Sequence, residues 1–195
     1  MLKNFNKQTL PKMPKLFFGY FLCALGISMM YQARSLGLGP WDVLHTGVMN
    51  HTPLSFGQTS QLTGFVLILL SFFLGIYPGI GTVFNMVFVG IFIDVINNSS
   101  VLFSPQTFVG KLIMLEMGVW VLSIGIYFYL KSGLGAGPRD GLMLGLVKKL
   151  KLPISLIKTS NEVTAVLIGA ILGGSVGVGT INCSFDTGIC NSNGF

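Results

Sequence analysis

Long apolar stretches without charged side chains dominate this sequence. Residues 16–33 carry no charge, and residues 59–95 contain one charged side chain, Asp94. A helix rises about 1.5 Å per residue, so about 20 apolar residues cross the ~30 Å hydrocarbon core of a bilayer. Residues 16–33 therefore predict one membrane span. Residues 59–95 predict two spans, separated by a turn at Tyr77-Pro78-Gly79, because proline and glycine end helices and permit reversals.

Two further spans and the overall composition complete this fold class. We expect a fourth span at residues 112–130 and a fifth at residues 163–181. Only 9% of the 195 residues are charged and the mean hydropathy is +0.74, whereas soluble domains carry about 25% charged residues. A soluble globule with so few charges would leave large apolar patches in water. The sequence therefore predicts an all-α polytopic membrane protein that contacts the lipid bilayer.

The positive charges lie in two blocks that predict the orientation in the membrane. The net charge is +6, and ten of the twelve basic residues precede the first span or lie within residues 131–158. Cytoplasmic loops of membrane proteins carry such an excess of lysine and arginine. We therefore expect a cytoplasmic N-terminus (residues 1–15), an external loop (residues 98–110) and a cytoplasmic basic stretch. We expect no nucleic-acid partner.

Two short segments, residues 40–50 and 138–150, have helical composition but are too short to span. Each begins at a proline that follows Gly-x-Gly, and the two segments align at an offset of 98 residues. Seven of the twelve positions from 36 to 47 are identical to their counterparts. We interpret them as short broken or re-entrant helices in a duplicated unit.

The duplicated unit predicts inverted halves. The first repeat (residues 16–97) has three spans, and an odd number repeated in tandem gives two halves of opposite topology, as in many secondary transporters. The second repeat (residues 111–182) has two spans and is followed by a polar tail, residues 183–195. The third span of this repeat is absent, and truncation, a frameshift and a natural five-span architecture all fit.

Asp42 and Asp140 are the first candidate site residues. Each lies two residues after the proline that opens its short helix. A carboxylate in the first turn stabilises a helix N-terminus, which is the structural interpretation. The functional interpretation is a pair of pseudo-symmetric carboxylates that bind a cation or proton where broken helices begin.

Other charged residues complete the candidate solute or ion site. Glu116 lies near the start of the fourth span and Glu162 lies where the fifth span starts. A charge within a span is costly and is a functional hypothesis by default. Lys158, four residues before Glu162, offers an ion-pair explanation instead. Arg139 replaces Trp41 of the first repeat and would neutralise Asp140, receive an anionic group or anchor the chain at the membrane interface.

His45 lies three residues after Asp42, on the same helix face. Asp42, His45 and His51 supply too few ligands for a metal, so we expect no metal site. No catalytic motif or dinucleotide fingerprint is present, so we expect neither an enzyme nor a bound cofactor. We interpret Asp94, at the end of the third span, as an interfacial residue whose charge reaches water.

Small residues and cysteines predict packing. Gly169, Gly173 and Gly177 would form a small-residue stripe on one face of the fifth span, which lets another backbone approach closely. We expect this stripe to support either internal packing or association with a second copy or a partner helix. Cys23 is interpreted as a buried apolar residue, and Cys183 and Cys190 would pair only if the tail faces an oxidising space.

The paired motifs, Gly37-Leu38-Gly39-Pro40-Trp41-Asp42 and Gly135-Ala136-Gly137-Pro138-Arg139-Asp140, resemble the YczE/YyaS/YitT family of bacterial integral membrane proteins, and the YczE branch in particular. The resemblance covers residues 15 to about 182 and implies a bacterial plasma-membrane location. It also implies a transporter-like or accessory role, and it transfers no catalytic residue.

Two functions follow, with a membrane enzyme as a third. The first is a transporter for a small solute or ion with its site at the repeat interface. The second is a non-transporting accessory or regulatory partner of another protein. A cavity lined by both aspartates would favour transport, and a filled centre would favour the accessory role.

Overall fold

The computed structural model describes residues 10–99 and 101–180, and within these residues all regular secondary structure is helical. Short 3₁₀ turns, η2 (Leu10–Lys12) and η3 (Arg34–Leu36), flank the first long helix. The α-helices are α1 (Met13–Gln32), α2 (Pro40–Met49), α3 (Phe56–Phe73), α4 (Ile80–Asn98), α5 (Phe108–Lys131), α6 (Pro138–Leu150) and α7 (Ile154–Ile171).

Five of these helices, α1, α3, α4, α5 and α7, are long and apolar enough to cross a membrane. This confirms the predicted all-α, multi-pass membrane fold. Helices α2 and α6 contain 10 and 13 residues and are too short to cross the bilayer at about 1.5 Å per residue. Each begins at a proline preceded by glycine, because the fixed φ of proline suits the first helical position and its missing N–H costs nothing there.

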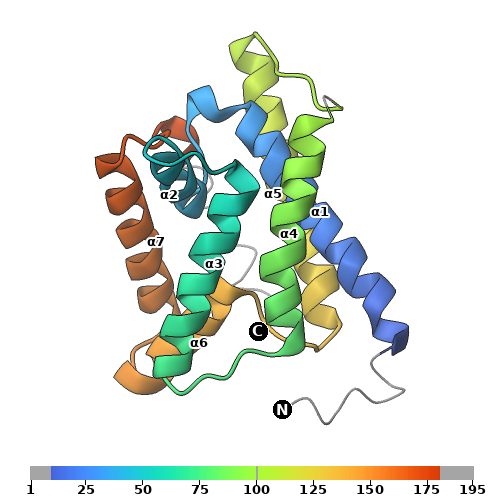
Figure 1. The fold of residues 1–195 in the computed structure, drawn as a ribbon. Coiled ribbons are helices and arrows are strands. Elements are labelled where there is room, and N and C mark those ends of the chain that lie inside the picture. Colours follow the sequence, from blue (N-terminus) through green and yellow to red (C-terminus); the bar gives the residue numbers. More distant parts are fainter. Residues whose placement is uncertain (1–9, 100, 181–195) are drawn as a thin grey trace.

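The short helices lie at opposite ends of the bundle. In Figure 1, α2 lies in the upper half, whereas α6 lies at the lower end, the end at which α1 starts. The connection between α4 and α5 lies at the upper end. The α4–α5 connection and α6 therefore lie at opposite ends of the bundle. Which end faces the cytoplasm stays a prediction.

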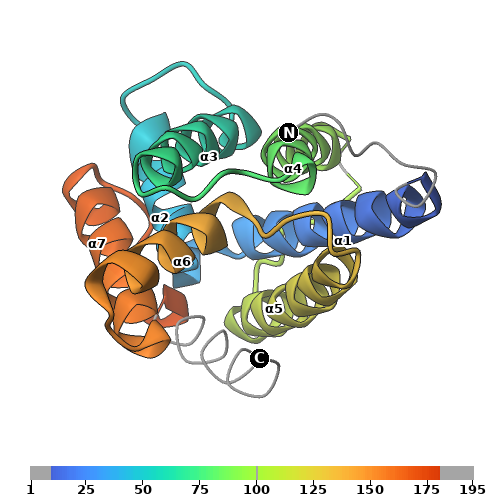
Figure 2. The ribbon, with the colours of Figure 1, turned by 90° about the horizontal axis from the view of Figure 1, so that it is seen from below.

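Helices α1 and α5 form the centre of the packing. Seen from below, α1 lies between α4 and α5 (Figure 2). The backbones of α1 and α5 approach closely at glycines: a Cβ added at Gly26 would lie 2.6 Å from the Gly118 carbonyl oxygen, and one at Gly125 would lie 2.6 Å from the Cys23 nitrogen. Small residues allow such contact between membrane helices. Cys23, predicted to be buried, is 3% exposed.

The short helices pack on the long helices of the other half of the chain. Helix α2 packs on α7, and α6 packs on α3. Gly47 permits the first contact, since an added Cβ would lie 2.9 Å from the Leu172 Cβ. Gly145 permits the second, since an added Cβ would lie 3.1 Å from the Leu74 Cβ. In both contacts a glycine of the short helix faces the leucine that directly follows the last residue of the long helix.

The fifth span differs from its prediction. Helix α7 covers Ile154–Ile171 and not residues 163–181. It begins earlier because Pro153 serves as its N-cap residue, although its first turns contain polar side chains that masked the span in the sequence. It ends earlier because Gly173 adopts a left-handed conformation with φ 75°, which is how glycine terminates helices.

The predicted glycine stripe on one helical face is therefore wrong. Gly173 and Gly177 follow the end of α7, and Gly169 faces α2: its added Cβ would lie 2.6 Å from the Leu44 nitrogen. Gly169 and Gly177 thus serve contacts inside this chain. The predictions for Cys183, Cys190, the polar tail and the absent sixth span concern residues outside the described ranges.

Candidate functional site

The first turns of α2 and α6 meet inside the bundle. Asp42 is in the first turn of α2, and Arg139 is the second residue of α6. The Arg139 Nη2 atom lies 3.7 Å from Asp42 Oδ1, and the guanidinium carbon lies 5.4 Å from the centre of the Trp41 ring. Trp41 and Arg139 occupy aligned positions of the two motifs. We call Trp41, Asp42, His45 and Arg139 the central cluster.

Two side chains of the central cluster are deeply buried. Asp42 is 4% exposed and His45 is 1% exposed. Asp42 Oδ1 and His45 Nδ1 lie 3.4 Å apart, yet neither atom makes a hydrogen bond with any described residue. Most buried polar atoms in proteins have a hydrogen-bond partner. This arrangement therefore leaves hydrogen-bonding capacity unused at the point where the two short helices meet.

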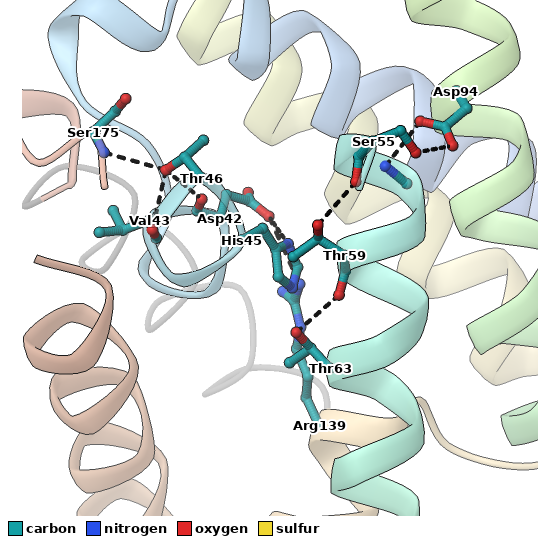
Figure 3. Close-up of polar contacts among 11 residues, drawn as sticks. Asp42, Val43, His45, Thr46, Ser55, Thr59, Thr63, Asp94, Arg139 and Ser175 are labelled. Atoms are coloured by element: carbon teal, nitrogen blue, oxygen red, sulfur yellow. Dashed lines mark hydrogen bonds and ion pairs between the residues drawn. The ribbon is translucent and has the colours of Figure 1, made fainter. Parts of the chain in front are cut away.

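Neighbouring elements hold α2 in place around the cluster. The Thr46 hydroxyl donates to the Asp42 carbonyl oxygen at 3.0 Å and accepts from the Ser175 N–H at 3.2 Å, which ties α2 to the segment after α7. The Phe56 ring meets the His45 ring edge-on, with centres 5.5 Å apart. Figure 3 shows Arg139 reaching toward Asp42 and His45 along the side of α3 that carries Thr59 and Thr63.

The surroundings of His45 determine its charge. Burial lowers the pKa of His45 below its ordinary value. The neighbouring Asp42 carboxylate opposes this effect, and the positive charge of Arg139 adds to it. The imidazole is therefore neutral near pH 7, and the formal charges of the cluster are those of Asp42 and Arg139.

Asp140 has different partners from Asp42. Its Oδ2 atom accepts a hydrogen bond from the Tyr129 hydroxyl at 3.0 Å, and Tyr129 is 5% exposed on α5. Burial raises the pKa of the Asp140 carboxyl, while Tyr129 and the Arg139 charge lower it. The two aligned aspartates therefore lie in chemically distinct environments, which the sequence repeat does not reveal.

The two glutamates lie on the long helices α5 and α7. Glu162 Oε1 lies 3.9 Å from Lys158 Nζ, and both side chains are mostly buried on α7. The charge of Arg139 also acts on Glu162. Glu116 lies half-buried on α5. The roles of both glutamates in a site stay predictions.

Asp94 forms a polar contact that sequence reasoning missed. It accepts hydrogen bonds from the Ser55 hydroxyl and, at 2.9 Å, from the Gly57 N–H, and thereby fixes the start of α3 to α4 (Figure 3). A carboxylate at a helix N-terminus is stabilised by the exposed N–H groups. In the structure, Ser55 and Gln58 form a capping box at the start of α3. A serine followed three residues later by glutamine is the sequence pattern that predicts such a helix start.

Two hollows border the helices outside the central cluster. One, of about 550 Å³, is lined by polar residues of α3 and α4, including Gln58, Gln61 and Asp94. The other, of about 330 Å³, lies at the second Gly-x-Gly break and is lined by Pro138 and Thr82, among others. Neither hollow is lined by Asp42 or Asp140. Within residues 10–99 and 101–180, no group of three or more His, Cys, Asp or Glu side chains is placed to hold a metal ion.

Comparison with known proteins places the chain in a family. Residues 10–192 match a family of unknown function, DUF6198. The chain is 34% identical over 174 residues to the uncharacterized membrane protein YczE of Bacillus subtilis (strain 168), covering 89% of this chain and 80% of that protein.

Two further relatives agree. An uncharacterized protein of Haemophilus influenzae is 34% identical over 146 residues, which cover 75% of this chain and 66% of that protein. The uncharacterized protein YyaS of Bacillus subtilis (strain 168) is 26% identical over 168 residues, which cover 84% of this chain and 82% of that protein. No solved structure matches. These matches confirm the YczE-type resemblance of the paired motifs, and the chain belongs to the DUF6198 family.

Proposed function

We propose that this membrane protein is a transporter for a small solute or ion, with its binding site at the central cluster. One observation carries the proposal: the first turns of two broken helices, one from each half of the chain, meet at Arg139 and Asp42. Broken helices that meet inside a bundle present charged groups and free backbone groups to solutes in secondary transporters. The unused hydrogen-bonding capacity of Asp42 Oδ1 and His45 Nδ1 supports a ligand at this position.

The proposal includes an inverted repeat of residues 16–97 and 111–182. Its support is reciprocal packing: α2 lies on α7 as α6 lies on α3, and Leu74 and Leu172 occupy aligned positions in these contacts. The contact of Arg139 with Trp41 also joins aligned positions, as expected near a pseudo-two-fold axis. We further propose a bacterial plasma-membrane location with a cytoplasmic N-terminus.

An accessory role is the second candidate, and two observations favour it. Neither hollow reaches the aspartates, and the Asp42 and His45 side chains are buried. The outer side of α7 is apolar and exposed, with Ile171 84% and Leu167 59% exposed. The glycine stripe no longer supports this role, because Gly169 packs against α2.

Uptake by purified protein in proteoliposomes tests the transport proposal. We expect flux of at least one labelled amine, amino acid, organic acid or inorganic ion, or of protons reported by an entrapped pH dye. The Asp42→Asn variant should abolish this flux at unchanged protein density, whereas Lys148→Gln, near the other end of α6, should retain it. Flux that is absent from the whole screen, or unchanged in Asp42→Asn, would contradict the transport proposal.

A further inference from the structure

We infer that the ligand of the central cluster is an organic cation with N–H donors, such as a guanidinium or primary ammonium compound, and that the Arg139 side chain occupies its place as a tethered substitute. The inference rests on the proposed function, because it assigns a ligand class to the same site. Two observations carry it. The Arg139 guanidinium lies near a carboxylate and an aromatic ring, and the buried Asp42 and His45 side chains of α2 each have an atom without a hydrogen-bond partner.

The first motif supplies the two groups that recognise organic cations. The Asp42 carboxylate provides the opposite charge, with its side chain 5% exposed, and the Trp41 ring provides an aromatic face. A cation near an aromatic face is attracted by the ring electrons, and the attraction grows where water is excluded. Arg139 uses both groups, so a guanidinium already occupies this position in the structure.

Arg139 fits this position loosely. Its Nη2 atom lies 3.7 Å from Asp42 Oδ1, beyond hydrogen-bonding distance, and its side chain is 36% exposed. Asp42 Oδ1 accepts no hydrogen bond from any described residue, and His45 Nδ1, beside it, is also without one. A smaller free cation that approaches more closely would donate to Asp42 Oδ1, which Arg139 does not do from its anchor on α6.

The charges around the cluster disfavour an anion. A ligand carboxylate would enter beside the buried Asp42 carboxylate, and like charges in a buried site repel strongly. The positive ends of α2 and α6 favour anions, but each first turn already contains an aspartate.

The fluorescence of Trp41 provides a direct test on the full chain in lipid nanodiscs. The chain has two tryptophans, and Trp120 is 66% exposed on α5, so Trp120→Phe leaves Trp41 as the only reporter. Methylguanidinium, methylammonium and acetate are titrated at constant ionic strength. In the Arg139→Ala variant, methylguanidinium should bind roughly tenfold more tightly than with Arg139 present, a gain within the range of a desolvated cation–π contact.

Companion variants make the result decisive. Asp42→Asn combined with Arg139→Ala should abolish the response to methylguanidinium, whereas Lys148→Ala should leave it unchanged. Arg139→Gln replaces Arg139→Ala if the alanine variant does not fold, as judged by circular dichroism and gel filtration. Arg139→Lys should keep the weak binding of the unmodified site, because it retains a tethered cation.

The outcomes separate this inference from the proposed function. A response to acetate that disappears in Arg139→Ala would overturn the cation class and leave a binding site at the cluster. Asp42-dependent uptake of an anion in proteoliposomes would have the same meaning. No response to any of the three probes in folded variants, together with no Asp42-dependent flux, would overturn both.

Discussion

The two Gly-x-Gly-Pro-x-Asp motifs fold alike and differ in chemistry. In both, proline opens a short helix and aspartate lies in its first turn. Asp42 lies beside His45 and Arg139, whereas Asp140 accepts a hydrogen bond from Tyr129. The comparison teaches that the motif determines where a helix starts, while the packed neighbours determine the chemistry of its carboxylate.

The backbone breaks before these helices differ as well. An added Cβ at Gly37 would lie 2.6 Å from the Gly177 nitrogen, so backbone meets backbone there. Gly135 faces the Thr82 hydroxyl and borders the hollow of about 330 Å³. The first break is therefore closed by the segment after α7, and the second break has free space beside it.

The prediction with the largest expected effect concerns the orientation of the two halves in the membrane. If the two short helices are not at opposite sides of the membrane, the comparison of the two motifs as inverted copies fails. In a chain with its three cysteines replaced, single cysteines at Gln106 and Lys149 should react with a membrane-impermeant maleimide from opposite sides. The reason is that the α4–α5 connection and α6 lie at opposite ends of the bundle. We expect labelling of position 106 in intact cells and of position 149 only after permeabilisation. Labelling of both positions in intact cells would contradict the inverted arrangement.

The next effect sharpens the difference between the two breaks. Gly37→Ala should lower the free energy of unfolding by about 3–5 kcal/mol, because it adds a backbone clash to the strain of a positive φ. Gly135→Ala should cost about 1–3 kcal/mol, because the atom nearest to its added Cβ is the Thr82 hydroxyl at 2.8 Å rather than backbone at 2.6 Å. Gly75→Ala is the matched control, since its φ is 79° and nothing lies within 4 Å of an added Cβ. Denaturant titration in detergent measures all three, and equal costs at Gly37 and Gly75 would show that the close approach is unimportant.

The prediction with the smallest expected effect is a pH dependence of stability that arises from α2 and its histidine, His45. Because the pKa of His45 is lowered in the folded chain, the unfolded chain binds more protons below about pH 6.5, the ordinary histidine value. The contribution of neutral His45 to the free energy of unfolding is therefore fully present above that pH. Stability should therefore fall by up to about 1.4 kcal/mol per pH unit as the pH drops from about 6.5 toward the folded pKa.

Paired melts at pH 7.5 and 5.5 measure this dependence. His45→Gln should reduce the difference between the two conditions, whereas His51→Gln should not, because His51 is exposed. Met143 occupies the position of His45 in the second motif, so α6 has no equivalent histidine. An unchanged difference in His45→Gln would show that other groups control the pH response.

Much of the fold follows from local sequence. Apolar length predicted the spans, and glycine followed by proline predicted the starts of α2 and α6. The prediction for α7 failed at both ends, because Lys158, Asn161 and Glu162 made its first turns look like a loop. The glycine stripe failed with it, because helical periodicity was applied beyond Ile171, the end of the helix.

The candidate site was only partly visible in the sequence. Asp42, His45 and Arg139 were each predicted, and the repeat gave a reason to compare the two motifs. The contact of Arg139 with Asp42 joins residues far apart in the chain, as does the contact of Asp94 with Ser55. Spacing along the chain carries no signal for such pairs.

By itself, the sequence determined that this chain is a helical membrane protein with two short helices opened by paired motifs, because hydrophobic length and the geometry of proline and glycine act locally. Only the tertiary structure decided which aspartate lies beside arginine and which accepts a hydrogen bond from tyrosine. The reason is that the packing of α2 on α7 and of α6 on α3 sets how the first turns of the two short helices face each other.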